Sequence, residues 1–561
     1  MLLGIDVGGT FTDAVVLDNG RVVAFAKTPT DHSALLASIT ASISKVLERV
    51  SSSSIKRISL STTIVTNTLI EEKEDKAALF LIPGPGVNIS SLVPVKPVIL
   101  SGYTDHTGKM KLDIDENEIV SSAIRVRESS KDVKVAAVAG KFAIRNPKLE
   151  HTVKDIVKQN LKTDHITLGS EVAGTLNFLR RANSAYYNAA VWRTFKNFAE
   201  QMKKSLEQIG LDAPVYILKA DGGTMLLDTA LELPVEAIFT GPAASVLGII
   251  ALTDVSEEAK VSIDIGGTSS DIAIWQNKVP LFSPNGAKVN KYPTAVRSFW
   301  LNSIGVGGDS YVRREDGELK IGPMRNGPAM AAGGNYPTVF DAVRYLDKSD
   351  YGEKDLAEKA MKIIALEGQT LTEAAEEVVN KSAEIIVNSI LEMIEEKQQR
   401  PVYKVEDIVK EEKFEIKEVV GIGGAANGLV EKVAEKLSVK AVLPVYGMLA
   451  NAIGAASSKP TTYITLRADT NQDVYTVPEL GIKEKLPQRP FLAKDAIKLA
   501  YKHLEERALK SGIEVSPDEE IEEVYLEEFN VIKGFSTMGK IISLKLQIKS
   551  GVLMKIERAE N

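Results

Sequence analysis

The chain has 561 residues, of which 44% are apolar and 25% are charged, and its net charge is −7. A chain of this length exceeds one hydrophobic core, so we expect two or three domains. The negative charge argues against nucleic acid or an anionic membrane as the main partner, and the absence of cysteine excludes thiol nucleophiles, disulfides and cysteine-bound zinc. Because neither a long uninterrupted apolar run nor a signal-peptide pattern is found, we expect a cytoplasmic protein without a membrane span.

The N-terminal region has the pattern of an α/β domain. Two apolar runs, 2–7 and 13–18, flank a Gly-Gly turn and predict a β-hairpin, which the run 21–29 extends. Apolar residues at helical spacing predict a helix over 32–50. A second helix is expected over 61–73, because Ser and Thr residues suited to helix capping open that segment.

The rest of the chain continues with mixed elements and then changes character. The segment 415–444 predicts a strand, a glycine loop, a helix and a further strand, and a charged α+β pattern begins near residue 461. The other predicted strands are 76–85, 134–140 and 214–223, and the other predicted helices are 176–210, 353–368 and 372–400. We therefore expect three regions, namely 1–170, then 171–460 with a helical insertion, then 461–561.

One short motif occurs twice, first as GIDVGGTFTD from Gly4 and again as SIDIGGTSSD from Ser262. In each copy a strand delivers an aspartate to a Gly-Gly turn, where the backbone can approach a ligand closely and its N–H groups can bind an anion. An aspartate at a strand end can hold Mg²⁺, which neutralises phosphate oxygens. A single copy would suit an ordinary hairpin equally well. Two matching copies favour two halves of one Mg²⁺-nucleotide clamp.

The motif assigns roles to particular side chains. Asp6 and Asp264 are expected to hold Mg²⁺ and to count among the catalytic residues, while Asp13 and Asp271 are candidates for orienting water or acting as general base. The residues expected to bind the nucleotide phosphates are Gly8, Gly9, Thr10, Thr12, Gly266, Gly267, Thr268 and Ser269.

A third glycine loop follows the strand expected from residue 415. Gly421, Gly423, Gly424 and Asn427 are expected to contact the adenosine part of a nucleotide. A dinucleotide site would need an acidic residue at the end of the next strand, and the run 439–444 ends in proline without one. A nicotinamide cofactor is therefore disfavoured, and adenine nucleotides are preferred.

The three loops, in this order, resemble the superfamily of actin, sugar kinases and heat-shock-chaperone ATPases. GPAASVLGIIALTD resembles the connecting helix of that superfamily, and ANAIGAASS resembles its final helix, which crosses between domains. The resemblance implies an α/β fold of duplicated ribonuclease H-like domains around an ATP cleft, followed here by a small α+β C-terminal region. The duplication would explain why the motif occurs twice.

Within that superfamily the chain resembles the hydantoinase/oxoprolinase A-type subunits, of the N-methylhydantoinase A kind. The motifs that carry the resemblance are GIDVGGTFTD, STTIVTNTLIEE, RRANSAYYNA, DGGTM, GPAASVLG, IDIGGTSSD, SIGVGGDS and YPTVFDA. They cover about residues 1–460. Three departures concern the substrate more than ATP: Asp309 stands where glycine is expected, the segment 324–335 is altered, and the tail after 461 is shorter.

The resemblance implies an enzyme that opens a cyclic amide, such as a hydantoin, 5-oxoproline or a related lactam, using ATP and Mg²⁺. The γ-phosphoryl group would move to the carbonyl oxygen, so that water can attack the activated carbon. The candidate substrate residues are Thr62, Thr63, Asn67, Arg181 and Asp309. A small-molecule kinase, an ATP-dependent ketone carboxylase subunit and an ATP-gated binding protein stay open as alternatives. A B-type partner subunit and an oligomer are also expected.

Overall fold

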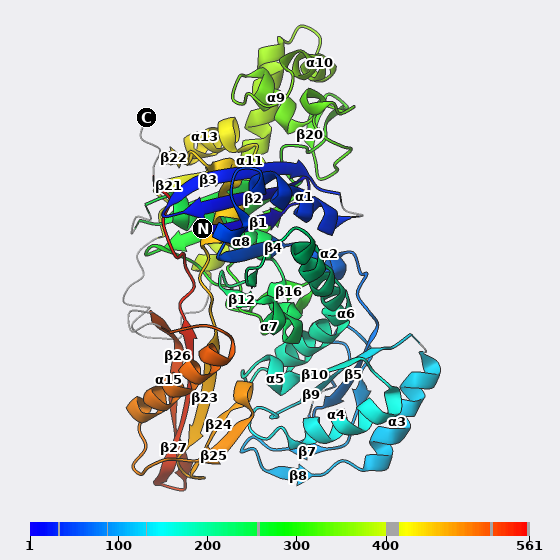
Figure 1. Cartoon of the computed structure of the whole chain (residues 1–561), viewed down its shortest axis with the longest axis vertical. Coiled ribbons are helices and arrows are strands. Elements are labelled where there is room, and N and C mark those ends of the chain that lie inside the picture. Colours follow the sequence, from blue (N-terminus) through cyan, green and yellow to red (C-terminus); the bar gives the residue numbers. More distant parts are fainter. Residues whose placement is uncertain are drawn as a thin grey trace.

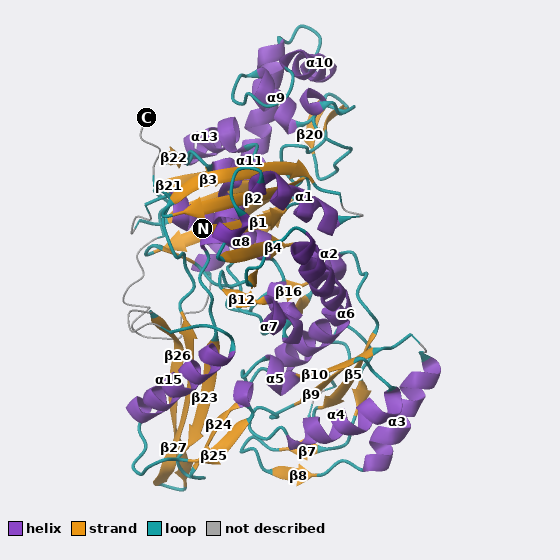
Figure 2. Ribbon diagram, viewed as in Figure 1, coloured by secondary structure: helices purple, strands orange, loops and turns teal. Residues whose placement is uncertain are grey.

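A computed structural model describes residues 1–31, 34–86, 88–130, 132–254, 258–399, 414–515 and 520–557, and Figures 1 and 2 show their arrangement. Two central sheets lie in the middle of the elongated molecule (Figure 1). A helical region lies at one end, and an inserted α/β unit and a C-terminal sheet lie side by side at the other (Figure 2). The helix expected over 32–50 is α1, Leu35–Leu47, and its expected first two residues lie outside the described ranges.

The first central sheet, sheet A, has the strand order β12-β11-β4-β1-β2-β3. Its strands are β1 Leu2–Val7, β2 Phe11–Asp18, β3 Arg21–Pro29, β4 Arg57–Thr62, β11 Val215–Leu218 and β12 Thr224–Leu226. The expected hairpin is β1–β2, with β3 beside it. The helix expected from residue 61 begins only at Ile64, as α2 Ile64–Ile70, because Ser61 and Thr62 complete the buried strand β4 beside β1.

The second central sheet, sheet D, repeats this plan. Its order β15-β14-β13-β21-β22 matches β3-β2-β1-β4-β11, with the same antiparallel hairpin and the same parallel neighbour. Its strands are β13 Lys260–Ile265, β14 Ser270–Gln276, β15 Val279–Pro280, β18 Leu301–Ile304, β21 Glu418–Ile422 and β22 Lys440–Val442. The repeated order confirms the predicted duplication of ribonuclease H-like domains.

Two helices hold the halves together. α8, Thr240–Leu252, and α14, Ala450–Ser457, pack so closely that a Cβ on Gly248 would lie 2.1 Å from the carbonyl oxygen of Ala450. A Cβ on Gly454 would lie equally close to the carbonyl oxygen of Ala244. α14 follows the strands of sheet D, yet it packs on β1, β2 and β4 of sheet A. Backbone-to-backbone packing at this crossing therefore couples the two sheets.

The first half also carries an insertion. Sheet B has the order β10-β9-β5-β6 and is flanked by three helices. Its elements are β5 Ala77–Ile82, β6 Val98–Ile99, α3 Glu116–Ser129, β9 Val135–Gly140, α4 Lys148–Leu161, β10 His165–Leu168 and α5 Gly169–Val172. A small hairpin, β7 Tyr103–Thr104 and β8 Met110–Leu112, lies beside it. Sheet A draws β11 and β12 from beyond residue 170, so the first half continues past the boundary expected there.

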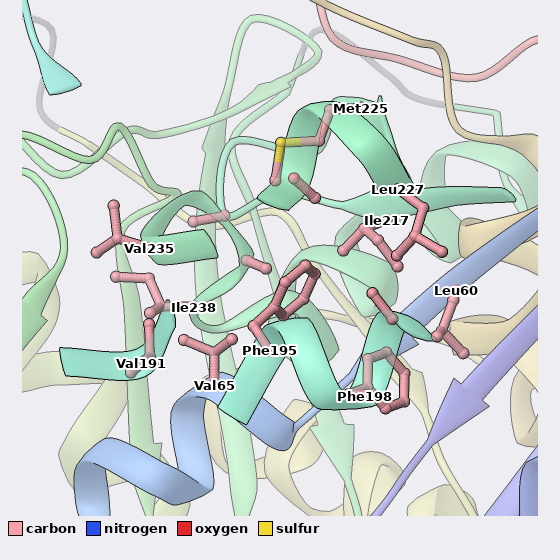
Figure 3. Packing of buried hydrophobic residues seen from close by; sticks show 14 of the residues in the cluster. Leu60, Val65, Val191, Phe195, Phe198, Ile217, Met225, Leu227, Val235 and Ile238 are labelled. Atoms are coloured by element: carbon pink, nitrogen blue, oxygen red, sulfur yellow. The ribbon is translucent and has the colours of Figure 1, made fainter. Parts of the chain in front are cut away.

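A long helix, α6 Phe178–Gln208, joins the insertion to sheet A. Its Phe195 is fully buried and packs with residues of β4, β11 and α7 Leu227–Glu232, as Figure 3 shows. Truncating such a side chain typically costs about 3–5 kcal/mol of stability. This core therefore fixes the insertion relative to the first sheet.

The remaining elements form the two ends of the molecule. The helical end contains β19 Val312–Glu315, β20 Glu318–Ile321, α9 Val339–Tyr345, α10 Lys354–Ile364, α11 Leu371–Gln398 and α13 Ala426–Leu437. A further small hairpin is β16 Lys288–Val289 with β17 Tyr292–Pro293. The C-terminal sheet, sheet K, is antiparallel with the order β25-β24-β23-β27-β26 and packs against α15 Ala493–Lys510. Its strands are β23 Tyr463–Asp469, β24 Val474–Val477, β25 Ile482–Lys485, β26 Ile521–Lys533 and β27 Ser536–Ile548.

Candidate nucleotide site

The two copies of the motif form the same backbone turn. Asp6 pairs with Asp13 across the first hairpin, and Asp264 pairs with Asp271 across the second. The first glycine of each turn donates its N–H to the carbonyl three residues later, at 3.0 Å in both hairpins. Each turn therefore places one carboxylate at the end of the first strand and another at the start of the second.

The two turns lie face to face at close range, one from each half of the molecule. A Cβ on Gly267 would lie 2.7 Å from Thr10 Oγ1, and a Cβ on Gly9 would lie 4.0 Å from Thr268 Oγ1. Only a residue without a side chain permits this approach at Gly267. The fold therefore brings Gly9, Thr10, Gly267 and Thr268 together, although the two copies lie in different halves of the sequence.

Asp6 carries an uncompensated buried oxygen. Its side chain is 7% exposed, and Oδ1 has no hydrogen-bond partner among the residues that the structure describes. Burial, opposed by a hydrogen bond with Ser61 and aided by the charges of Asp13 and Asp264, raises the pKa of Asp6 to about 7. A cation beside this group would supply the missing partner and favour its charged form, so the donor set fits Mg²⁺.

Asp264 is held in place from two sides. Asn451, at the start of α14, donates a hydrogen bond of 3.0 Å to Oδ2. Gly423 has a positive φ of 98°, and a Cβ there would lie 2.8 Å from Asp264 Oδ1. Burial raises the pKa of Asp264, and the bond from Asn451 opposes that shift. Sequence reasoning missed Asn451, because its contact with Asp264 depends on the helix crossing.

The described residues offer few direct ligands for a metal ion. They contain no group of three or more His, Asp or Glu side chains placed to hold one ion. Mg²⁺ characteristically keeps several waters and uses one or two carboxylates together with phosphate oxygens. Asp6 and Asp264 are consistent with that mode of binding, in which most ligands come from water and the nucleotide.

The second aspartates of the two hairpins differ. Lys27 on β3 lies opposite Asp13, and its Nζ donates to both carboxylate oxygens at 2.7 and 2.6 Å. In the second hairpin Ser303 on β18 takes the position of Lys27, opposite Asp271. Burial and the charge of Asp264 raise the pKa of Asp271 to about 7, and a hydrogen bond with Ser303 opposes the shift. Asp13 thus has a cationic partner, whereas none of the residues that the structure describes places a cation beside Asp271.

An arginine that the sequence did not single out links the two turns. Arg325 donates from Nη2 to Thr10 Oγ1 at 3.1 Å and to Asp309 Oδ2 at 2.8 Å. Asp309 donates its own N–H to the carbonyl of Gly267 at 2.7 Å, so it lies against the second turn. Asp309 and the segment that contains Arg325 are both departures from the family pattern. The structure shows that Asp309 and Arg325 contact each other, directly beside the two Gly-Gly turns.

The third glycine loop divides into two roles. A Cβ on Gly421 would lie 2.3 Å from a Val430 methyl group, so Gly421 permits α13 to pack on β21. Gly424 has open space where its Cβ would be, and Asn427 is exposed. Gly424 and Asn427 are therefore available to a ligand, whereas Gly421 serves packing.

Several residues expected in the site lie elsewhere or on its border. Thr12 is fully buried and its hydroxyl hydrogen-bonds Thr30, so it does not reach the turn surface. Arg181 is also fully buried, and it donates to the carbonyls of Thr175 and Gly140 beside the insertion. The candidate substrate residues at the start of α2 lie at the same edge of sheet A as Asp6, and they are Thr62, Thr63 and Asn67.

Sheet order, facing turns and crossing helices together define a two-lobed protein of the actin-like ATPase class. Two family models agree with this class and identify the family within it. The hydantoinase/oxoprolinase model matches residues 181–463, and the model of the hydantoinase/oxoprolinase N-terminal region matches residues 2–161. The chain belongs to the hydantoinase/oxoprolinase family, as its motifs predicted.

Relatives with known names match parts of the chain. The caprolactamase subunit alpha of Pseudomonas jessenii is 26% identical over 61% of this chain and 53% of its own length. The 5-oxoprolinase PfmaA of Pestalotiopsis fici is 24% identical over 79% of this chain and 39% of its own length. The acetophenone carboxylase gamma subunit of Aromatoleum aromaticum is 23% identical over 61% of this chain and 52% of its own length. The chain thus spans about half, or less, of these relatives.

Two solved structures share the fold over almost the whole chain. A nucleotide-free acetone carboxylase covers 99% of this chain and 88% of its own with a TM-score of 0.72 at 16% identity. The ATP-dependent caprolactamase from Pseudomonas jessenii gives the same coverage with a TM-score of 0.71 at 20% identity. Within the described ranges, no helix combines the length and the apolar character that crossing a membrane requires.

Proposed function

We propose that the chain binds Mg²⁺-ATP between its two hairpin turns and activates the carbonyl group of a cyclic amide by phosphorylation. The observation that carries the proposal is the facing pair of turns, with the orphaned Asp6 Oδ1 beside them. Relatives named caprolactamase and 5-oxoprolinase support a cyclic amide as substrate. Adenine nucleotides, rather than nicotinamide cofactors, stay our prediction for the third loop.

In this proposal each side chain has a distinct task. Asp6 and Asp264 hold Mg²⁺, which when bound neutralises charge on the phosphate oxygens. Asp13, paired with Lys27, keeps the first turn neutral beside a polyphosphate. Asp271 has a pKa near neutrality and no cationic partner among the described residues, which suits a group that takes a proton from water. Arg325 donates to phosphate oxygens as it now donates to Thr10 and Asp309.

The proposed reaction begins with transfer of the γ-phosphoryl group and ends with hydrolysis. The carbonyl oxygen attacks the γ-phosphorus, a new O–P bond forms, and the bond to ADP breaks. Water then adds to the activated carbon and the C–N bond breaks, so that the amine leaves with a proton and an acyl phosphate remains. A second water attacks the acyl carbon, the C–O bond of the acyl phosphate breaks, and phosphate leaves with the former carbonyl oxygen. The products are ADP, phosphate and an amino acid. An unactivated amide resists water because resonance stabilises its carbonyl, so the phosphoryl group supplies the leaving group that hydrolysis needs.

A ketone carboxylase is the second candidate, because acetone and acetophenone carboxylases are among the structural and sequence relatives. The two candidates share phosphorylation of a carbonyl or enol oxygen and differ in the next nucleophile. We favour the hydrolase, since the caprolactamase subunit has the higher sequence identity of the two relatives named as subunits.

An isotope experiment tests the proposal. The chain is incubated with ATP, Mg²⁺ and a cyclic amide whose carbonyl carries ¹⁸O, with caprolactam, 5-oxoproline and hydantoin compared in turn. We expect ¹⁸O in the released phosphate, as measured by mass spectrometry. A phosphorylated alcohol from a polyol would instead identify a kinase, and carboxylated product from a ketone with bicarbonate would identify a carboxylase.

A partner subunit belongs to the same proposal. Two of the relatives are named as subunits, and the chain spans about half of each. We expect slow substrate-stimulated ADP release from the chain alone and efficient ring opening after the partner is added, since closed sites protect reactive intermediates from water. Rapid stoichiometric ring opening by the purified chain alone would contradict the need for a partner.

A further inference from the structure

A cavity of about 760 Å³ lies where the insertion, the first half and sheet K meet. Its walls come from α4, β10 and α5 of the insertion, from the segment after β11, and from β24 and α15. None of the hairpin residues lines it. The cavity is therefore separate from the nucleotide turns, although Lys219 in its wall follows β11 at the edge of sheet A where Asp6 lies.

The deep part of this cavity contains buried acceptors without partners. Thr461 and Thr476 are 3% and 5% exposed, and neither hydroxyl has a hydrogen-bond partner among the described residues. The same holds for Oε1 of Glu479 and for the hydroxyl of Thr163, both of which line the cavity. Buried polar atoms are normally paired, so this concentration indicates that a bound molecule supplies donors here.

Glu236 adds a buried charge to these acceptors. It lies in the short 3₁₀ helix Pro234–Ala237 and is 6% exposed, and its carboxylate makes no hydrogen bond or ion pair with any residue that the structure describes. Lys219, Lys545 and Arg507 lie near enough to favour its charged form, against the burial that raises its pKa. These cations favour the charged carboxylate from a distance, and the cavity is the side from which a donor can contact it directly.

The outer part of the cavity has the opposite character. Four cationic side chains stand along its wall at partly or fully exposed positions, and they are Lys154, Lys158, Lys483 and Lys510. Two acidic residues of the lining are engaged, since Asp164 lies 3.5 Å from Arg193 and Glu171 lies 3.8 Å from Lys154, and a third, Glu232, is exposed. The inner cations of the lining are already engaged, Lys219 with Asp221 and Arg507 with the carbonyl of Tyr463, so the unpaired acceptors stay available inside and exposed ammonium groups stand outside.

We propose that this cavity binds an amino acid, with its ammonium group directed inward to Glu236, Thr461, Thr476 and Glu479 and its carboxylate directed to the outer lysines. The ammonium group has three N–H donors, which matches several unpaired acceptors, and a carboxylate matches the lysine rim. The inference rests on the lining alone and not on the proposed reaction. Ring opening of a cyclic amide would nevertheless release a molecule of this class.

Calorimetry on the full chain tests the site. The probes are 6-aminohexanoate and L-glutamate, with hexanoate and hexylamine as analogues that each carry one charge. We expect at least one amino acid to bind about tenfold or more tightly than both analogues, because only it satisfies both parts of the lining. Binding should persist when ADP saturates the nucleotide turns. Equal binding of all four probes, or binding of none, would overturn the proposal.

Matched variants locate the binding. Glu236→Gln should weaken the amino acid at least about tenfold, because the ammonium loses its buried charged acceptor. Glu232→Gln, an exposed position on the same wall, should change affinity by less than about threefold. Thermal melting and ATP binding check that Glu236→Gln is folded. Lys483→Gln is exposed and does not threaten the fold, and it should weaken binding several-fold. Wild-type affinity in both Glu236→Gln and Lys483→Gln would contradict the site.

Discussion

The two hairpins share one backbone and differ in what surrounds their second aspartate. In the first half the neighbouring strand places Lys27 beside Asp13, and in the second half it places Ser303 beside Asp271. Burial raises the pKa of both carboxylates, but Lys27 opposes that shift at Asp13, whereas the pKa of Asp271 is raised to about 7 without a cationic partner among the described residues. The duplication therefore repeats the turn and gives its second aspartate two different surroundings, and in our proposal one lobe binds phosphate while the other handles a proton.

The largest expected effect concerns the first aspartates, which the two lobes share. Asp264→Asn should weaken Mg²⁺-dependent ATP binding well over tenfold, because a buried ligand charge is lost while Asn451 still holds the side chain. Calorimetry of ATP with and without Mg²⁺ measures the change. Asp316→Asn, the same chemical change in the exposed β19–β20 turn, serves as control. Unchanged titrations for Asp264→Asn would remove the central claim of nucleotide binding.

The second aspartates should respond unequally. Asp271→Asn should lower the rate of substrate-stimulated ADP release by about 10²-fold or more, since it removes a proton acceptor with a suitable pKa. Asp13→Asn should cost less, because Asp13 is already paired with Lys27. The pH dependence distinguishes the roles, because the acid limb near pH 7 should become shallower in Asp271→Asn, where Asp6 still titrates in this range, and should keep its shape in Asp13→Asn. Equal losses with unchanged pH profiles would show that the two lobes act alike.

Substitutions of Arg325 and Asp309 should change the affinity for ATP in opposite directions. Arg325→Gln should weaken ATP binding about tenfold, because a charge-assisted bond to phosphate is lost. Asp309→Asn should strengthen ATP binding, because it releases Arg325 from its present ion pair. Nucleotide titrations read both effects. If Asp309 contacts the amide substrate instead, its variant will raise the KM for that substrate and leave ATP affinity unchanged.

The last expected effect is on stability without nucleotide. The folded-state pKa of Asp271 lies above its ordinary value, so the folded chain holds this proton more tightly than the unfolded chain. Its contribution is present below about pH 4 and is lost as pH rises through about 7, by at most about 1.4 kcal/mol per pH unit. Asp271→Asn should flatten this decline in denaturant melts. An unaltered slope between pH 4 and 7 would show that Asp271 titrates normally.

Local patterns in the sequence predicted much of the fold. The hairpins, their Gly-Gly turns, α6 and the helices α10 and α11 follow from apolar periodicity and glycine positions that act within a few residues. The repeated motif then indicated the duplication. Where capping preference competed with pairing at Ser61 and Thr62, the buried position beside β1 prevailed, because tertiary pairing overrides weak local propensity.

By itself the sequence determined the two turns and their aspartates, because a turn needs only adjacent residues. Only the tertiary structure decided which side chains surround them. Lys27 reaches Asp13 through strand register, Asn451 reaches Asp264 through a helix crossing, and Arg325 reaches Thr10 across the two halves. The same holds for Arg181, which packing buries beside the insertion instead of in the site. Such contacts join residues far apart in the chain, so no local spacing encodes them, and they set the charge of each aspartate.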